Sequence, residues 1–192
     1  MAKREKKIDR GLYDWVQAVV CPLLAMVLVF TFLLRIVRVD GDSMRETLQD
    51  GDMLLVLSGA LCGDYRPGDV VVLRKEGFHG GNLIVKRVVA VGGQTVDIDF
   101  SAGAVYVDGQ VLEEDYIRQP TYLEEGMKFP VTLEEGELFV MGDNRNDSDD
   151  SRNPSLGPVD SRCVVGRAML LALPGETADT GRRDISRIGL LG

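Results

Sequence analysis

The stretch WVQAVVCPLLAMVLVFTFLL, residues 15–34, divides this 192-residue chain into two unlike parts. It holds twenty residues without a charge, and about 20 apolar residues let an α-helix cross the roughly 30 Å of bilayer hydrocarbon. A cleaved secretory peptide is disfavoured, because the run is too long and ends at Arg35 and Arg38 without a small-x-small pair. The stretch therefore predicts a transmembrane helix that is retained as an anchor.

The charges on either side of this run differ in sign. Residues 1–14 carry five basic and three acidic groups, an excess that predicts a cytoplasmic N-terminus and an extracytoplasmic remainder in the cell membrane. The whole chain has 22 basic and 30 acidic groups, which leaves 17 basic and 27 acidic groups, a net charge of −10, after residue 14. Such an acidic part is a poor nucleic-acid binder, because phosphates require basic patches.

Beyond the run, short segments rich in β-branched residues alternate with Gly, Pro, Asn and Asp, the pattern typical of strands and turns. We predict a mostly β fold: one transmembrane helix followed by an all-β domain at 35–174, with an exposed acidic insertion at 112–136 and a peripheral tail at 175–192. Hairpin turns are expected at 91–94 and at Asp108-Gly109. The predicted strands are 53–57, 69–74, 83–91, 95–99, 104–107, 137–141 and 164–173.

The chain has three cysteines, and one of them, Cys21, lies within the membrane run. Cys62 and Cys163 are the two that could pair in the outer domain, and the sequence leaves this pairing open. The dense cysteine framework of a disulfide-stapled module is absent from the sequence.

The inventory of reactive groups narrows the chemistry. His79 is the single histidine and the sequence has no CxxC or HExxH motif, so neither a zinc site nor a Ser-His-Asp triad is favoured, and no cofactor or metal is expected. A lysine can replace histidine as a base when burial lowers its pKa. Lys86, within NLIVKRVVAV, fits this role, although an edge-strand lysine that prevents aggregation would look the same.

A second polar stretch, GDNRNDSDDSRNPSLGPV at 142–159, follows an apolar strand and mixes aspartates with arginines. It does not fit an EF-hand loop, because position 6, counted from Asp143, is Ser148 instead of glycine. An irregular calcium site and a solvated, internally paired turn both remain open.

Three segments follow the anchor: GDSMRETL (41–48), IVKRVVAVGGQTV (84–96) and MGDNRNDSDDSR (141–152), the last followed by LGPV. In this order they resemble the serine, lysine and Gly-Asp-Asn-Arg boxes of bacterial type I signal peptidases. The resemblance covers roughly residues 10–170, and the combination of boxes is far more specific than any one of them.

The resemblance implies a Ser-Lys dyad, with Ser43 as the nucleophile and Lys86 as the general base. Ser148 resembles the second serine of the family, which orients the lysine. The remaining residues of the third box resemble those that hold the site together by ion pairing: Asp143, Arg145, Asp150 and Arg152.

The family also implies substrates with small residues at positions −1 and −3 of the cleavage site, bound as an extended strand beside 39–44 and 83–86. Met44, Ile84 and Val85 are then the candidates for its shallow apolar pockets. The oxyanion would take the Ser43 backbone N–H and a second donor near Gly41, where some relatives carry a serine. Glu46 is a further departure, because relatives usually have a proline there.

The predicted function is a membrane-bound serine endopeptidase that removes signal peptides from exported preproteins through an acyl-enzyme. Its expected partners are signal peptides and the lipid bilayer, with no nucleic acid and no obligate protein partner. Two alternatives stay open on the sequence alone: a membrane-anchored β binding module, with or without a stabilising calcium ion, and a Ser-Lys hydrolase that cleaves itself or one dedicated partner.

Overall fold

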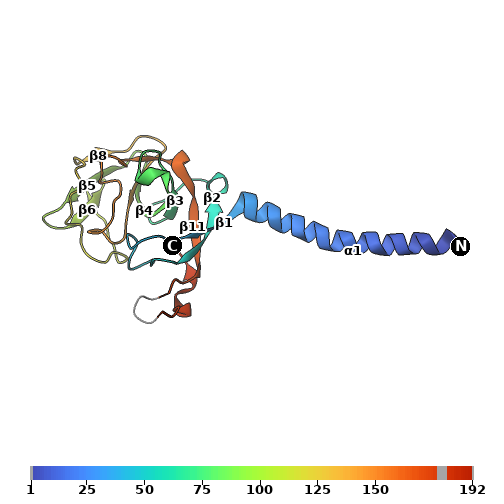
Figure 1. The fold of residues 1–192 in the computed structure, drawn as a ribbon. Helices are drawn as coiled ribbons and strands as arrows, with labels where there is room; N and C mark the ends of the chain where they lie inside the picture. Colours follow the sequence, from blue (N-terminus) through green and yellow to red (C-terminus); the bar gives the residue numbers. More distant parts are fainter. Residues whose placement is uncertain (1, 177–180, 192) are drawn as a thin grey trace. The chain divides into compact units, whose positions relative to one another are not determined.

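The computed structural model of this chain describes residues 2–176 and 181–191. It forms two compact units, Met1–Arg35 and Ile36–Gly192 (Figure 1). The first is helical and the second is built of β-strands.

The helical unit consists of α1 (Ala2–Leu28) and a π-helical turn, η1 (Val29–Leu33). Its segment Tyr13–Leu33 is 21 residues long, is apolar enough to cross a membrane and has no buried residue. Large apolar side chains such as Trp15 and Phe32 are exposed along it. The apolar helix expected at 15–34 is therefore present, but the helix begins much earlier, at Ala2, and Leu34 already has an extended backbone.

The β unit contains two antiparallel sheets (Figure 1). The larger has the order β1-β2-β11-β3-β4-β9-β10, with β12 paired to β11, and the smaller has the order β7-β6-β5-β8. The strands are β1 (Leu34–Arg38), β2 (Met53–Ser58), β3 (Val70–Leu73), β4 (Ile84–Val91), β5 (Thr95–Asp99), β6 (Ala104–Val107), β7 (Gln110–Val111), β8 (Val131–Thr132), β9 (Glu137–Met141), β10 (Val159–Asp160), β11 (Val164–Leu173) and β12 (Gly189–Leu190).

All seven strands expected from the sequence are present, with ends shifted by one residue at most. The expected hairpin turn at Asp108-Gly109 is present between the paired strands β6 and β7, with φ 52° and 76°. The chain also turns at 91–94, with φ 85° at Gly93, but the hairpin expected there is wrong, because β4 and β5 lie in different sheets. The sequence did not reveal β1, which follows the membrane run directly, or four two-residue strands. A pair of residues is too short to show an alternating pattern, so these strands depend on their neighbours.

Strand β4 lies in the interior of the larger sheet, between β3 and β9. Both of its faces are covered: Val85 packs into one apolar cluster, Val88 into a second and Val89 into a third. Residues 84–87 of β4 pair with β3 and residues 87–91 pair with β9, so Lys86 is paired on one side only. Its side chain is nevertheless only 3 % exposed, which does not fit the alternative of a solvated lysine that protects a sheet edge.

The tail expected to be peripheral, 175–192, needs a correction, although residues 177–180 and 192 lie outside the described residues. Its described part contains η5 (Ile185–Arg187) and β12, and Leu191 packs against the core. Arg187 forms an ion pair with the fully buried Asp52, with Nη2 2.7 Å from Oδ2. A buried carboxylate requires a partner, so this part of the tail belongs to the packed domain.

The three cysteines are free thiols in the structure, so Cys62 and Cys163 do not form a disulfide. The Cys62 thiol lies within hydrogen-bonding distance of the carbonyl oxygens of Leu57 and Ser58, at 3.3 Å from each.

Candidate active site

Ser43 and Lys86 are 43 residues apart in the chain and in direct contact in the fold. The Lys86 Nζ donates a hydrogen bond to the Ser43 Oγ across 2.7 Å. Lys86 comes from β4, whereas Ser43 lies on the turn that follows β1. Asn144 holds this turn from the loop after β9: its backbone N–H donates to the Ser43 carbonyl at 3.0 Å and its side chain to the Asp42 carbonyl at 3.1 Å.

Lys86 is only 3 % exposed. Burial lowers the pKa of its ammonium group, because the charged form loses its hydration. The negative charges of Asp150, Glu125 and Asp149 oppose this shift and the positive charge of Arg152 adds to it. The net effect is a lowered pKa, which makes the neutral amine more accessible, and a neutral amine beside a hydroxyl can accept its proton.

Asp150 and Arg152 form a fully buried ion pair next to this lysine. The Arg152 Nε lies 2.8 Å from the Asp150 Oδ1, and the other carboxylate oxygen accepts from the Gly142 backbone N–H at 2.9 Å. Burial alone would raise the pKa of Asp150, but the hydrogen bond and charge of Arg152 hold it below its ordinary value. Asp150 is therefore a fixed negative charge beside the amine.

Ser148 is buried next to this pair, and its Oγ donates to the Asp150 Oδ2 at 2.9 Å. It lines the same cavity as Ser43 and Lys86. The contact that the structure gives this hydroxyl is therefore with Asp150, and an action on Lys86 would pass through that carboxylate.

Asp143 pairs with Arg87, a partner that the sequence did not reveal. The pair is bidentate: Arg87 Nε donates to Oδ1 at 2.9 Å and Nη2 donates to Oδ2 at 2.7 Å. Thr47, on the Ser43 turn, donates to the same carboxylate at 2.6 Å. This cluster connects β4, the loop after β9 and the nucleophile turn.

Arg145 is buried and pairs with Glu114, while its Nη1 donates to Thr121 at 2.9 Å. Both partners belong to the stretch 112–136, most of which is exposed and irregular as expected. The expectation of a simple exposed insertion is nevertheless corrected. Glu114 and Thr121 contact the buried Arg145, and Glu125 contacts the buried Arg152. Thr121 is itself fully buried. Buried guanidinium groups need acceptors, and this loop supplies them.

A cavity of about 300 Å³ opens at the Ser43–Lys86 contact. Ile84 and Val85 line it, together with Gly41. Met44 does not line it: this side chain is 1 % exposed and belongs to the apolar core, which corrects its assignment to a substrate pocket. The Gly41 backbone N–H donates to the Asp50 Oδ1 at 3.0 Å, so this particular donor is already engaged.

His79 lies on the rim of the same cavity. Its Nε2 is 2.9 Å from the Asp149 Oδ2. The hydrogen-bond partner of the Ser43 hydroxyl is Lys86 and not this histidine. Two further aspartates of the third box are likewise engaged, Asp143 by Arg87 and Asp150 by Arg152. Among the described residues no group of three or more His, Cys, Asp or Glu side chains is arranged to hold a metal ion.

Known proteins with similar sequences are signal peptidases. Residues 12–173 match the family model described as signal peptidase, peptidase S26. A signal peptidase I from Bacillus licheniformis is 33 % identical over 172 residues, covering 85 % of this chain and 90 % of its own. A probable signal peptidase I-1 from a Synechocystis strain is 36 % identical over 170 residues, covering 81 % of this chain and 82 % of its own.

A crystal structure of a signal peptidase I from Enterococcus faecalis is 28 % identical and covers 54 % of this chain and 96 % of its own, with a TM-score of 0.43. From the family model and the sequence relatives, the chain is a hydrolase of the serine peptidase class. It belongs to the signal peptidase family, peptidase S26.

Proposed function

We propose that this chain is a membrane-bound endopeptidase that removes signal peptides from exported preproteins, with Ser43 as the nucleophile and Lys86 as the general base. One observation carries the proposal: the Lys86 Nζ lies 2.7 Å from the Ser43 Oγ, on a lysine that is only 3 % exposed. Membership of the signal peptidase family supports the choice of substrate.

The reaction follows from this contact. Neutral Lys86 takes the proton from Ser43, whose oxygen attacks the scissile carbonyl, and the ammonium group then protonates the leaving amine. This leaves an acyl-enzyme, which a water molecule hydrolyses after giving its proton to the same lysine. The Ser43 backbone N–H is the first donor to the oxyanion. The second donor is a group other than the Gly41 N–H, because Asp50 accepts from that N–H.

The other residues of the site support the dyad without touching the substrate. Asp143 and Arg145 anchor the loop after β9 through Arg87 and Glu114. Asp150 and Arg152 form the buried pair beside the lysine, and Ser148 orients Lys86 through Asp150.

The substrate binds as an extended strand along 39–44 and 83–86, with small residues at positions −1 and −3. The register of β4 supports this mode: Ile84, Val85 and Lys86 pair with β3, whereas within the described residues the pairing with β9 begins only at Arg87. The side of β4 away from β3 is thus open beside the cavity, and backbone groups there can bind a peptide. Ile84 and Val85 contact the small side chains.

In the membrane, we assign residues 1–14 to the cytoplasm, 15–34 to the span and 35–174 to the extracytoplasmic catalytic domain, followed by the tail 175–192. The basic excess before the span supports this orientation. At no more than about 3.5 Å per residue, the segment from Leu34 to Ser43 cannot extend beyond about 30 Å, which keeps the nucleophile at the membrane surface. Signal peptides and the lipid bilayer are the partners in this proposal, and the chemistry requires no cofactor.

The test is cleavage of a labelled preprotein with an Ala-x-Ala site by the full chain in detergent or lipid. The intact chain is expected to cut after that site, whereas Ser43→Ala is expected to be inactive and Lys86→Ala to lose at least about 10²–10⁴-fold in rate while both remain folded. A chain that binds the preprotein without cutting it, or a Ser43→Ala variant that still cuts, would refute the proposal.

A further inference from the structure

Glu125 lies in the middle of the 112–136 loop, yet its side chain is only 10 % exposed. Its Oε1 is 2.9 Å from the Arg152 Nη2, and its Oε2 accepts from the Asp150 backbone N–H at 3.2 Å. The backbone on either side is fixed to the same arginine: Arg152 Nη1 donates to the Leu123 carbonyl at 3.0 Å, and the Met127 N–H donates to the Arg152 carbonyl at 2.9 Å. The loop thus places a carboxylate in the buried surroundings of Lys86.

Four buried ionisable groups share this region: Lys86, Arg152, Asp150 and Glu125, here called the base cluster. With all four ionised, two positive charges balance two negative charges. When Lys86 becomes the neutral base, the cluster keeps one negative charge in excess. An excess charge away from water is unfavourable, so the loss of a proton from Lys86 favours the gain of a proton by a carboxylate of the cluster.

Glu125 is the carboxylate suited to take up that proton. Asp150 is held ionised by Arg152, the Ser148 hydroxyl and the Gly142 N–H. The Oε1 of Glu125, in contrast, is buried and lies 2.9 Å from the Arg152 Nη2 without the geometry of a hydrogen bond. Burial, and then the charge of Asp150, raise the pKa of Glu125 to about 7, while Arg152 lowers it and Asp149 raises it slightly.

We propose that Glu125 is a positioning residue of the reaction, which carries the proton of the base cluster while Lys86 is neutral and holds Lys86 in its ammonium form when it is itself ionised. The inference rests on the proposed function of Lys86 as the base. It assigns to the loop a role in the chemistry of the site. Besides each other, Lys86 and Glu125 both face the charges of Asp149, Asp150 and Arg152.

The consequence is that loss of the Glu125 charge makes Lys86 easier to deprotonate. A neutral glutamine at position 125 removes a charge that stabilises the ammonium form. A purely structural role of Glu125 predicts a different outcome: lower activity or stability, with the pH dependence unchanged.

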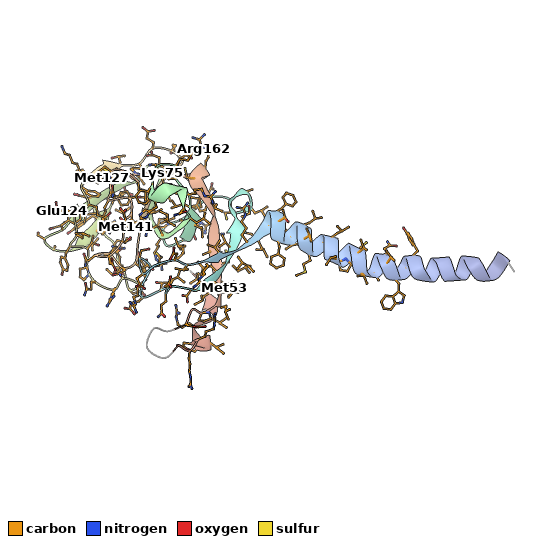
Figure 2. The ribbon with its side chains drawn as sticks, in the orientation of Figure 1. Met53, Lys75, Glu124, Met127, Met141 and Arg162 are labelled. Atoms are coloured by element: carbon orange, nitrogen blue, oxygen red, sulfur yellow. The ribbon has the colours of Figure 1, made fainter. Side chains whose placement is uncertain are left out.

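The experiment is the pH profile of kcat/KM between about pH 5 and 10, which reports the ionisation of the free enzyme, on the full chain in detergent with a labelled preprotein. Glu125→Gln is expected to shift the acid-side midpoint down by about one pH unit, with the gain in activity greatest between about pH 7 and the original midpoint, where Glu125 is ionised in the original chain. Glu125→Asp keeps the charge and is expected to stay near the original midpoint. Glu124→Gln is the matched control, because the exposed Glu124 (Figure 2) is the preceding residue, and it should leave the profile unchanged.

An unchanged or raised midpoint in Glu125→Gln would overturn the inference, and so would an equal shift in Glu124→Gln. These results are distinct from a failure of the proposed function, in which the original chain does not cut or Lys86→Ala retains activity. A second measurement needs no variant: infrared titration of the full chain should show one protonated carboxyl band with a midpoint near pH 7. Loss of every such band by about pH 5, the range of ordinary carboxyl groups, would also overturn the inference.

Discussion

Arg87 and Asp143 form a bidentate ion pair between β4 and the loop after β9, with both N–O distances at or below 2.9 Å and both side chains buried. Arg87 directly follows Lys86 on β4, so its side chain leaves the opposite face of the strand. One face of β4 therefore supplies the proposed base, and the other anchors the loop that carries Ser148 and Asp150 and contacts the nucleophile turn.

Removal of one partner from this pair should be costly. Asp143→Asn leaves the buried Arg87 guanidinium without its carboxylate, and we expect a loss of about 3–5 kcal/mol in the free energy of unfolding. Urea unfolding of the full chain in detergent measures this value. The exposed Asp64 offers a control, Asp64→Asn, which should be close to neutral. Equal stability of the two variants would show that the pair does not hold the loop.

Gly142 is a point of close approach between the nucleophile turn and Ser148. A Cβ at this position would lie closer than 3.0 Å to the Ser148 side chain and to the Ser43 carbonyl. Gly142→Ala should therefore displace both and greatly reduce preprotein cleavage. Gly189→Ala, whose Cβ would have its nearest neighbour at 3.9 Å, serves as the control. Full activity of Gly142→Ala would mean that the separation of Ser43 and Ser148 tolerates movement.

Lys86 should lower the stability of the fold at neutral pH. Its pKa is below the ordinary value of 10.5 because it is buried, so the unfolded chain binds this proton more tightly than the folded chain does. The penalty is present in full below the folded-state pKa and disappears as the pH rises to about 10.5. Lys86→Met should be inactive and yet melt at a higher temperature at neutral pH. The gain should shrink as the pH approaches that of free lysine, and a variant that is less stable at every pH would contradict this.

The ion pair of Arg187 with Asp52 attaches the described part of the tail to the domain. Arg187→Ala should cost about 1–3 kcal/mol, because Asp52 is fully buried and loses a charged partner while it keeps the N–H groups of Gly175 and Gln49. Unfolding and limited proteolysis after residue 174 both report this change. Arg162 (Figure 2) pairs with Asp160 at the surface, and Arg162→Ala should give no measurable change.

The strands and turns were largely predictable because their signals are local. The runs at 53–58, 84–91 and 164–173 are apolar, β-branched and bounded by turn residues, and the positive φ of Gly93 and Gly109 follows from the same local chemistry. Met44 shows where local signals end. An apolar side chain next to a nucleophile suits a substrate pocket and a core equally well, and only the packing placed it in the core.

The ion pairs also separate into those that could be predicted from nearby residues and those that could not. Asp150 and Arg152 are two residues apart, so their pairing could be expected from the third box. Asp143 and Arg87 are 56 residues apart, and Glu125 reaches Arg152 from a loop that otherwise resembles a solvated insertion. A contact of long sequence separation depends on which strands pair and in which register, and composition carries no information about that.

By itself, the sequence determined the apolar span, the β-rich domain, the absence of a second histidine and the three segments that contain Ser43, Lys86 and Asp150. These features depend on residue type and on short-range order, which are written directly in the chain. The tertiary structure decided that β4 is an interior strand, that Lys86 reaches Ser43 at 2.7 Å and that Glu125 lies beside the same buried charges. The physical reason is that desolvation and charge balance belong to the packed surroundings, which exist only once distant segments have come together.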